Sequence, residues 1–159
     1  MGALSATFIS SVLIILLTAP FNLHGQTPTQ VQAEDWSISC DKTCRASQLL
    51  ISKDNKLKYS ATLSLADEQN LLQMTLVFPL GIYLPANVAL MINDIEKIIP
   101  VITCVPSGCN ALLVINSELQ NEMIKASVFK VRFFTSSSSE NEVSYSLKGF
   151  KEALALVNQ

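Results

Sequence analysis

The alternation of hydrophobic and polar residues predicts a series of short β-strands from residue 36 onward. Residues 36–40 (WSISC) alternate with a period of two. The longest alternation covers 57–65, where apolar residues are separated by lysine, serine and threonine. Such a run predicts a strand with one face in the core and the other in water. Residues 71–78 (LLQMTLVF) are more continuously apolar, as in a buried strand.

The middle of the chain predicts a crossing segment followed by a hairpin. Residues 79–85 (PLGIYLP) contain two prolines and a glycine, too many breaks for a central strand. Residues 88–92 and 95–102 flank Asn93-Asp94, a pair that tolerates left-handed turn geometry. We therefore expect these two apolar runs to pair as a hairpin, and a further strand to follow over 111–115.

The C-terminal part mixes helices with strands. A short helix capped by Asn116 or Ser117 is expected first, followed by a strand over 129–133. The serine-rich stretch 135–142 is expected to be a flexible loop, and 143–147 a strand. A closing helix is then expected to bury Phe150, Ala153, Leu154 and Val157. Short strands separated by frequent turns indicate a mainly β chain. The expected fold is an antiparallel β-sandwich with one or two short helices near the C-terminus.

The first 33 residues differ in character from the rest, because no charged side chain occurs before Glu34. Residues 1–25 hold an apolar run that ends at Pro20, the size of the hydrophobic part of a signal peptide. The alternative is an uncleaved membrane anchor. Residues 26–33 (QTPTQVQA) are expected to form a polar linker, and 34–159 the folded domain.

Length and charge restrict the classes of partner. A chain of 159 residues suits one domain, and its formal net charge is −2. Binding to a nucleic-acid backbone needs clustered basic residues, whereas the eleven Lys and Arg are scattered. We therefore expect no nucleic-acid partner.

The four cysteines, Cys40, Cys44, Cys104 and Cys109, all follow the apolar segment. An even number of cysteines in an exported chain predicts disulfides. Three pairings are open, and the Pro and Gly between Cys104 and Cys109 favour the local pairs, because they make a turn that brings the two ends together. A zinc site with four thiolate ligands is the alternative.

Candidate catalytic groups are sparse. The only histidine is His24, in the segment expected to be removed, which excludes histidine bases and ligands from the mature domain. Ser39 with Lys42 and Ser127 with Lys130 match a serine–lysine spacing that also occurs by chance. The acidic pairs at 34–35 and 67–68 are adjacent in sequence, and neighbouring residues on a strand point apart. Residues 67–70 are also expected to form a solvated turn. We expect no catalytic residue, no cofactor and no metal site.

Four segments together resemble the invasion-associated locus B family of small exported bacterial proteins. They are 36–48 with Trp36, Cys40, Cys44 and Gln48, then 79–85 (PLGIYLP), 103–109 (TCVPSGC) and 147–154 (LKGFKEAL). The resemblance implies an immunoglobulin-like sandwich and an exported protein that is periplasmic, associated with the outer membrane or secreted. It also implies a role in host-cell invasion in some members, and no known enzymatic activity.

Three hypotheses for the function follow. The first is a non-enzymatic binding module that contacts an unidentified host or envelope protein and contributes to invasion or persistence, with at most a peripheral contact to the outer membrane. The second is a structural or chaperone-like periplasmic protein, whose exposed sheet edge accepts a partner's strand. The third is a hydrolase that uses two converging carboxylates.

Overall fold

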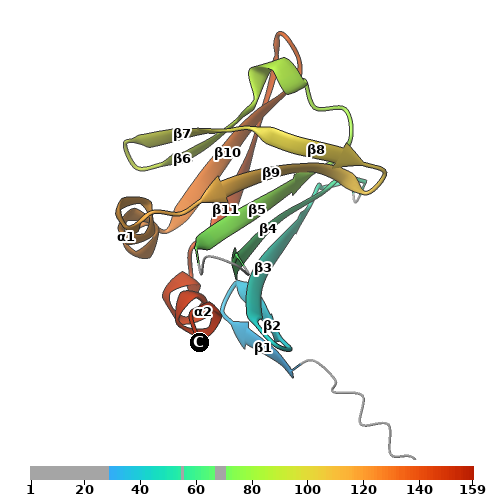
Figure 1. Ribbon diagram of the computed structural model, residues 1–159. Coiled ribbons are helices and arrows are strands. Elements are labelled where there is room, and N and C mark those ends of the chain that lie inside the picture. Colours follow the sequence, from blue (N-terminus) through green and yellow to red (C-terminus); the bar gives the residue numbers. More distant parts are fainter. Residues whose placement is uncertain (1–28, 55, 67–70) are drawn as a thin grey trace, which may run out of the picture.

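The computed structural model describes residues 29–54, 56–66 and 71–159, which form two antiparallel sheets packed face to face (Figure 1). One sheet has seven strands in the order β1-β2-β3-β4-β5-β9-β8, and the other has four in the order β11-β10-β6-β7. The strands of the larger sheet are β1 (Thr29–Ala33), β2 (Trp36–Cys40), β3 (Cys44–Ile51), β4 (Lys58–Leu65), β5 (Leu72–Phe78), β8 (Val101–Val105) and β9 (Gly108–Val114). The smaller sheet consists of β6 (Val88–Ile92), β7 (Ile95–Ile99), β10 (Val128–Ser136) and β11 (Ser139–Ser146).

Two α-helices lie at one end of the sandwich, away from the turn between β8 and β9 (Figure 1). Helix α1 (Ser117–Lys125) begins after Asn116, whose side chain accepts a hydrogen bond from the amide of Leu119. Helix α2 (Phe150–Val157) closes the chain. A short 3-10 helix, η1 (Leu84–Ala86), lies in the crossing from β5 to β6. Both expected helices and the crossing segment are confirmed.

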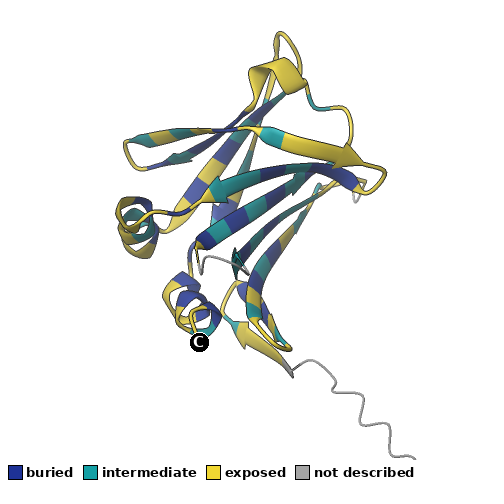
Figure 2. Ribbon diagram, in the orientation of Figure 1, coloured by how far each residue is buried: buried dark blue, intermediate teal, exposed yellow. Residues whose placement is uncertain are grey.

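The core lies between the two sheets and under α2, where most strands bury their inward residues (Figure 2). Trp36 is fully buried and its ring lies 5.7 Å from that of Phe150 on α2. Tyr145 on β11 stacks on Phe129 of β10 at 4.9 Å. The alternation that predicted β4 reflects its two faces, since Ala61 and Leu63 point into the core and Thr62 between them points outward.

The linker expected over 26–33 is wrong for Thr29–Ala33, which pairs with β2 as strand β1. Its polar residues resemble a linker because Gln30 and Gln32 face outward on an edge strand. Residues 1–25, where a signal peptide is expected, and 26–28 lie outside the described residues. The folded part described by the structure therefore extends before the domain start predicted at residue 34.

Two further expectations need correction. The apolar run 95–102 is not one strand, because Pro100 divides it and the chain leaves the smaller sheet as β7 and enters the larger one as β8. The serine-rich stretch 135–142 is not a flexible loop. It forms a tight hairpin in which Ser136 pairs with Ser139, and β11 continues from there. Strand β3 had no alternation clear enough to predict.

The side of the sandwich formed by β3 and β11 is held together by one buried polar side chain. Gln48 on β3 is 6% exposed. Its Nε2 donates a hydrogen bond to the carbonyl of Ser146 at 2.6 Å, and its Oε1 accepts one from the amide of the same residue at 3.1 Å. The amide group thus satisfies both backbone groups of a residue on the opposite sheet.

Each disulfide closes a hairpin of the seven-stranded sheet. The pairs are Cys40–Cys44, between β2 and β3, and Cys104–Cys109, between β8 and β9. These are the local pairs that the turn residues favoured. Because all four cysteine sulfurs are bonded to one another in pairs, none of them is a thiolate that could bind zinc. Disulfides are typical of proteins in oxidising compartments.

Candidate binding surface

A row of uncharged hydrogen-bonding side chains crosses five neighbouring strands of the seven-stranded sheet. The pairing aligns Gln32 with Ser37, Ser37 with Ser47, Ser47 with Thr62, and Thr62 with Thr75. Adjacent strands are spaced by about 4.8 Å, so the row extends over roughly 19 Å. We call these five residues the polar row.

A second set of outward residues runs beside the polar row. Gln30 aligns with Ser39 and Ser39 with Arg45, while Ser64 aligns with Gln73. Outward residues two positions apart on one strand share a face, so both sets form one surface. The polar face comprises Gln30, Gln32, Ser37, Ser39, Arg45, Ser47, Thr62, Ser64, Gln73 and Thr75.

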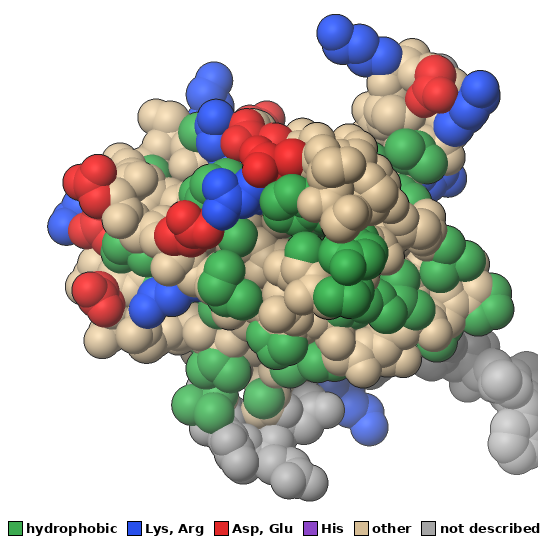
Figure 3. Space-filling view, turned by 90° about the horizontal axis from the view of Figure 1, so that it is seen from above, with side chains coloured by type: hydrophobic (Ala, Val, Ile, Leu, Met, Phe, Trp, Pro, Cys, Tyr) green, Lys and Arg blue, Asp and Glu red, His purple; other side chains and the backbone are tan. Residues whose placement is uncertain are grey.

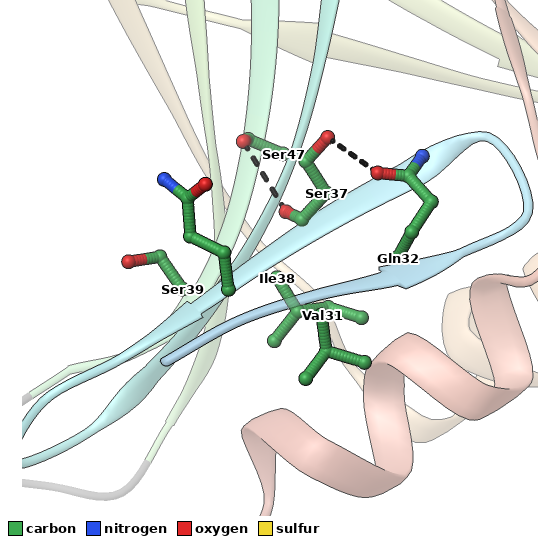
Figure 4. A pocket seen from close by; sticks show the side chains of 7 residues that line it. Val31, Gln32, Ser37, Ile38, Ser39 and Ser47 are labelled. Carbon is green, nitrogen blue, oxygen red and sulfur yellow. Dashed lines mark hydrogen bonds between the residues drawn. The ribbon is translucent and has the colours of Figure 1, made fainter. Parts of the chain in front are cut away.

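Two shallow pockets open on the polar face. One of about 310 Å³ lies over β1, β2 and β3, and one of about 320 Å³ over β3, β4 and β5. In the first, the Ser37 hydroxyl donates to Gln32 Oε1 at 3.0 Å and the Ser47 hydroxyl donates to the Ser37 carbonyl at 3.4 Å (Figure 4). Val31 points to the other side of the sheet, toward α2 (Figure 4).

The outer faces of the two sheets differ in charge. Arg45 is the charged member of the polar face. The outer face of the smaller sheet instead carries two ion pairs, Arg132 with Glu96, and Lys130 with Glu142 at 2.9 Å. Exposed ion pairs already have partners and interact with water, whereas hydroxyls and amides both donate and accept hydrogen bonds. The polar face is therefore suited to a ligand that is polar but weakly charged.

The turn closed by the first disulfide carries one perturbed carboxyl group beside this face. The amides of Thr43 and Lys42 donate hydrogen bonds to Asp41 and lower the pKa of its carboxyl group. Arg45 adds a smaller effect in the same direction. Asp41 is consequently a stable negative charge that orders the turn, and its depressed pKa gives it no proton to donate at neutral pH.

The candidate serine–lysine pairs, Ser39 with Lys42 and Ser127 with Lys130, lie in exposed positions. Ser39 lies on the polar face, while Lys42 lies in the exposed turn after β2. Glu34 and Asp35 are exposed in the turn between β1 and β2, and the acidic pair at 67–68 lies outside the described residues. Within residues 29–54, 56–66 and 71–159, no three His, Cys, Asp or Glu side chains gather in a way that could hold a metal ion.

Sequence reasoning missed the polar face altogether. The only signal was the repeated placement of serine and threonine at alternate positions, as in Ser60, Thr62 and Ser64. That spacing marks a solvated strand face, but it does not reveal which strands lie side by side.

The fold and this surface define a small, disulfide-bonded, two-sheet β-sandwich that presents a polar sheet face with Arg45 as its one charged member. The chain belongs to the family described as invasion associated locus B (IalB) protein, whose model matches residues 29–158. The resemblance noted in the sequence is thus confirmed, and the family match begins where strand β1 begins.

A solved structure supports the fold. The crystal structure of invasion associated protein b from Bartonella henselae matches with a TM-score of 0.70 and 20% sequence identity, covering 81% of this chain and 95% of that one. The expected immunoglobulin-like sandwich is thereby confirmed. No curated protein matches the sequence. The helices in the described part of the chain are too short and too polar to span a bilayer.

Proposed function

We propose that the chain is an exported, non-enzymatic binding protein that contacts a host or envelope protein through the polar face and contributes to host-cell invasion or persistence. The observation that carries this proposal is the polar row, which places five uncharged hydrogen-bonding side chains in line across β1 to β5. Membership of the IalB family supports the link to invasion.

The chemistry of the polar face favours a protein partner with exposed polar groups. Hydroxyl and amide side chains lose less hydration free energy on binding than charged ones do, and each can pair with either a donor or an acceptor. A stable protein contact buries about 800 Å² per partner. A surface that crosses five strands can supply much of that area, whereas the two shallow pockets on it are too open to enclose a small molecule.

Export is supported by the disulfides and by the apolar N-terminal segment. Both cysteine pairs are oxidised, and disulfides persist in the periplasm and outside the cell but not in a reducing cytoplasm. Residues 1–25 have the length and composition of a signal peptide. Fractionation with N-terminal sequencing tests this part of the proposal.

The decisive experiment compares binding by two matched variants. Ser47→Arg with Thr62→Arg places two long cations in the middle of the polar row. The control, Ser137→Arg with Ser138→Arg, adds the same charge in the exposed β10–β11 turn. We expect the control to bind host cells or envelope fractions like the unchanged protein, and the polar-row variant to lose at least tenfold in affinity, since each disrupted polar contact is worth about 1 kcal/mol.

Two outcomes contradict the proposal at different levels. Equal binding by both variants would show that the partner contacts another surface. If the protein binds neither host cells nor envelope fractions, and deletion of its gene leaves invasion unchanged, the binding function itself is wrong. Denaturation midpoints of both variants verify that the sandwich remains folded.

A second candidate function rests on the edge strand β8. It has β9 as its only partner within the described residues, and Ile102 is 58% exposed on it. An unpaired edge can accept a partner's strand, as a chaperone-like protein would require. The strand is, however, interrupted by a bulge between Val101 and Thr103, which shortens the usable edge. Envelope proteins that co-purify with the unchanged protein but not with Ile102→Lys would favour this function.

A further inference from the structure

Three turns meet at the end of the sandwich opposite the helices and form a surface distinct from the polar face. Residues of the β3–β4 turn, the start of the crossing segment and the β8–β9 turn together line one shallow pocket. In Figure 1 the β8–β9 turn lies at the end of the sandwich away from the helices. We define the lysine–leucine tip by the residues Lys53, Lys56, Leu57, Lys58, Pro79, Leu80 and Pro106.

Apolar side chains are exposed at the lysine–leucine tip. Leu57 is 43% exposed and Leu80 is 58% exposed. They lie beside Pro79 and Pro106 in the lining of the same pocket. Leucines on turns contribute nothing to the core while they remain in water, so burial against another apolar phase is the interaction they can still gain.

Three lysines surround these leucines. Lys53, Lys56 and Lys58 are all exposed, and the acidic residue of the same turn, Asp54, forms a loose exposed ion pair with Lys56 at 3.8 Å that an anionic surface can replace. The tip therefore carries a local charge of +2, and because the whole chain has a net charge of −2, the remainder carries −4. Figure 3 shows basic side chains that project beyond the rest of the surface, with hydrophobic side chains next to them. The molecule thus has a positive end and a negative remainder.

Hydrogen bonds join the two sides of the β3–β4 turn among its described residues. The amide of Ser52 donates to the carbonyl of Leu57 at 2.9 Å, and the amide of Leu57 donates to the Ser52 hydroxyl at 3.0 Å. Asp54 accepts hydrogen bonds from Ser52 and from the amide of Lys56, which lower the pKa of its carboxyl group. These hydrogen bonds hold residues 52 and 57 together before binding, which lowers the cost of ordering them on a surface.

From this geometry we propose that the lysine–leucine tip docks on a membrane surface that carries anionic phospholipid headgroups. The leucines enter the boundary between headgroups and acyl chains, while the lysines pair with phosphates around them. The negative remainder of the molecule is repelled by the same surface, which orients the sandwich with its tip toward the membrane. The inference is independent of the proposed partner-binding function, because the tip and the polar face share no residue.

The expected strength follows from the two kinds of side chain. A lysine near an anionic surface strengthens binding about fivefold, so three lysines together contribute on the order of a hundredfold. Full burial of a leucine contributes about tenfold or more. Binding should be reversible and should weaken as salt screens the charges.

The test measures co-sedimentation of the full chain, folded with both disulfides, with two kinds of vesicle: phosphatidylcholine alone, and equal parts of phosphatidylcholine and phosphatidylglycerol. The first tip variant replaces Lys53, Lys56 and Lys58 with Gln, and its control replaces Lys125, Lys148 and Lys151 with Gln. The second is Leu57→Ser with Leu80→Ser, matched by Ile98→Ser with Val128→Ser, which are equally exposed elsewhere. The apolar N-terminal segment is common to all variants, so differences between them report the tip.

We expect the unchanged protein to prefer the anionic vesicles. The lysine variant should lose that preference by on the order of a hundredfold, the leucine variant should lose about tenfold or more on the same vesicles, and both controls should be unchanged. Equal binding by tip variants and controls would overturn the proposal, as would binding that ignores phosphatidylglycerol. Tip-dependent retention on an immobilised acidic polypeptide, without tip-dependent vesicle binding, would overturn it in favour of an acidic protein partner.

Discussion

Replacement of Gln48 by Met should destabilise the sandwich more than any other polar-to-apolar change on β3. The substitution keeps the length of the side chain and removes its amide. Two hydrogen bonds to Ser146 are lost, each worth about 1 kcal/mol net, and the amide and carbonyl of this partly buried residue are left without those partners. The expected decrease in the free energy of unfolding is about 3 kcal/mol, a large part of a typical total of about 5–15 kcal/mol.

The assay is equilibrium unfolding in urea, with Gln73→Met as the matched control. Gln73 is half-buried on β5, and its only side-chain hydrogen bond among described residues joins Ser64 at 3.4 Å. We expect that control to cost less than about 0.5 kcal/mol, as for a surface substitution. A cost below about 1 kcal/mol for Gln48→Met would refute the reasoning, because such a small loss means that the Ser146 backbone groups find other partners.

Gln48→Glu adds a test of the hydrogen-bond directions. An ionised carboxylate can accept from the Ser146 amide but cannot donate to its carbonyl, and burial raises the pKa of the introduced group. A group whose pKa is raised in the folded state contributes stability at low pH and loses it as the pH rises through that pKa. The stability deficit relative to the unchanged protein should therefore shrink as the pH falls. A deficit that is independent of pH would contradict the assigned donor and acceptor.

Three further predictions follow from the structure. Burial raises the pKa of Tyr145 above its ordinary value of 10. Above about pH 10 this residue should therefore lower the free energy of unfolding by up to about 1.4 kcal/mol per pH unit. In unfolding curves measured at a series of alkaline pH values, Tyr145→Phe should remove this contribution to the pH dependence. Gly149→Ala should cost at least about 3 kcal/mol in urea unfolding, because φ is +77° and a Cβ would lie 2.1 Å from a carbonyl oxygen of β1, whereas Gly81→Ala, with open space around it, should cost about 1 kcal/mol. Reduction of the two disulfides should lower the free energy of unfolding by about 2 kcal/mol for each short loop and therefore lower the thermal midpoint. An unchanged midpoint in reductant would contradict this.

Most of the strands and both helices were predicted from short stretches of sequence, because the periodicity of a strand and the start of a helix depend on residues a few positions apart. The alternation of 57–65 reports which residues of β4 face the core, and Gly149 followed by Phe150 and Ala153 reports the start of α2 and its buried face. The prolines and glycine of 79–85 likewise mark the crossing between the sheets.

Two of the wrong predictions concern segments whose amino-acid composition is typical of a linker or a loop, although they form strands. An edge strand with outward glutamines has the composition of a linker, so β1 was missed. Consecutive serines have the composition of a loop, yet Ser136 and Ser139 pair across a tight hairpin that continues the ladder of β10 and β11. In both cases the backbone hydrogen bonds to a neighbouring strand outweigh weak local preferences.

The sequence by itself determined a mainly β sandwich and its closing helix and favoured the local cysteine pairs, because strand periodicity, helix caps and turn residues act over a few positions. Only the tertiary structure decided which strands are neighbours. That choice aligns Gln32, Ser37, Ser47, Thr62 and Thr75 into one row, and brings Lys56, Leu80 and Pro106 to one tip, although long stretches of sequence separate them. The physical reason is register: periodicity tells which way a side chain points, while non-local pairing determines what lies next to it.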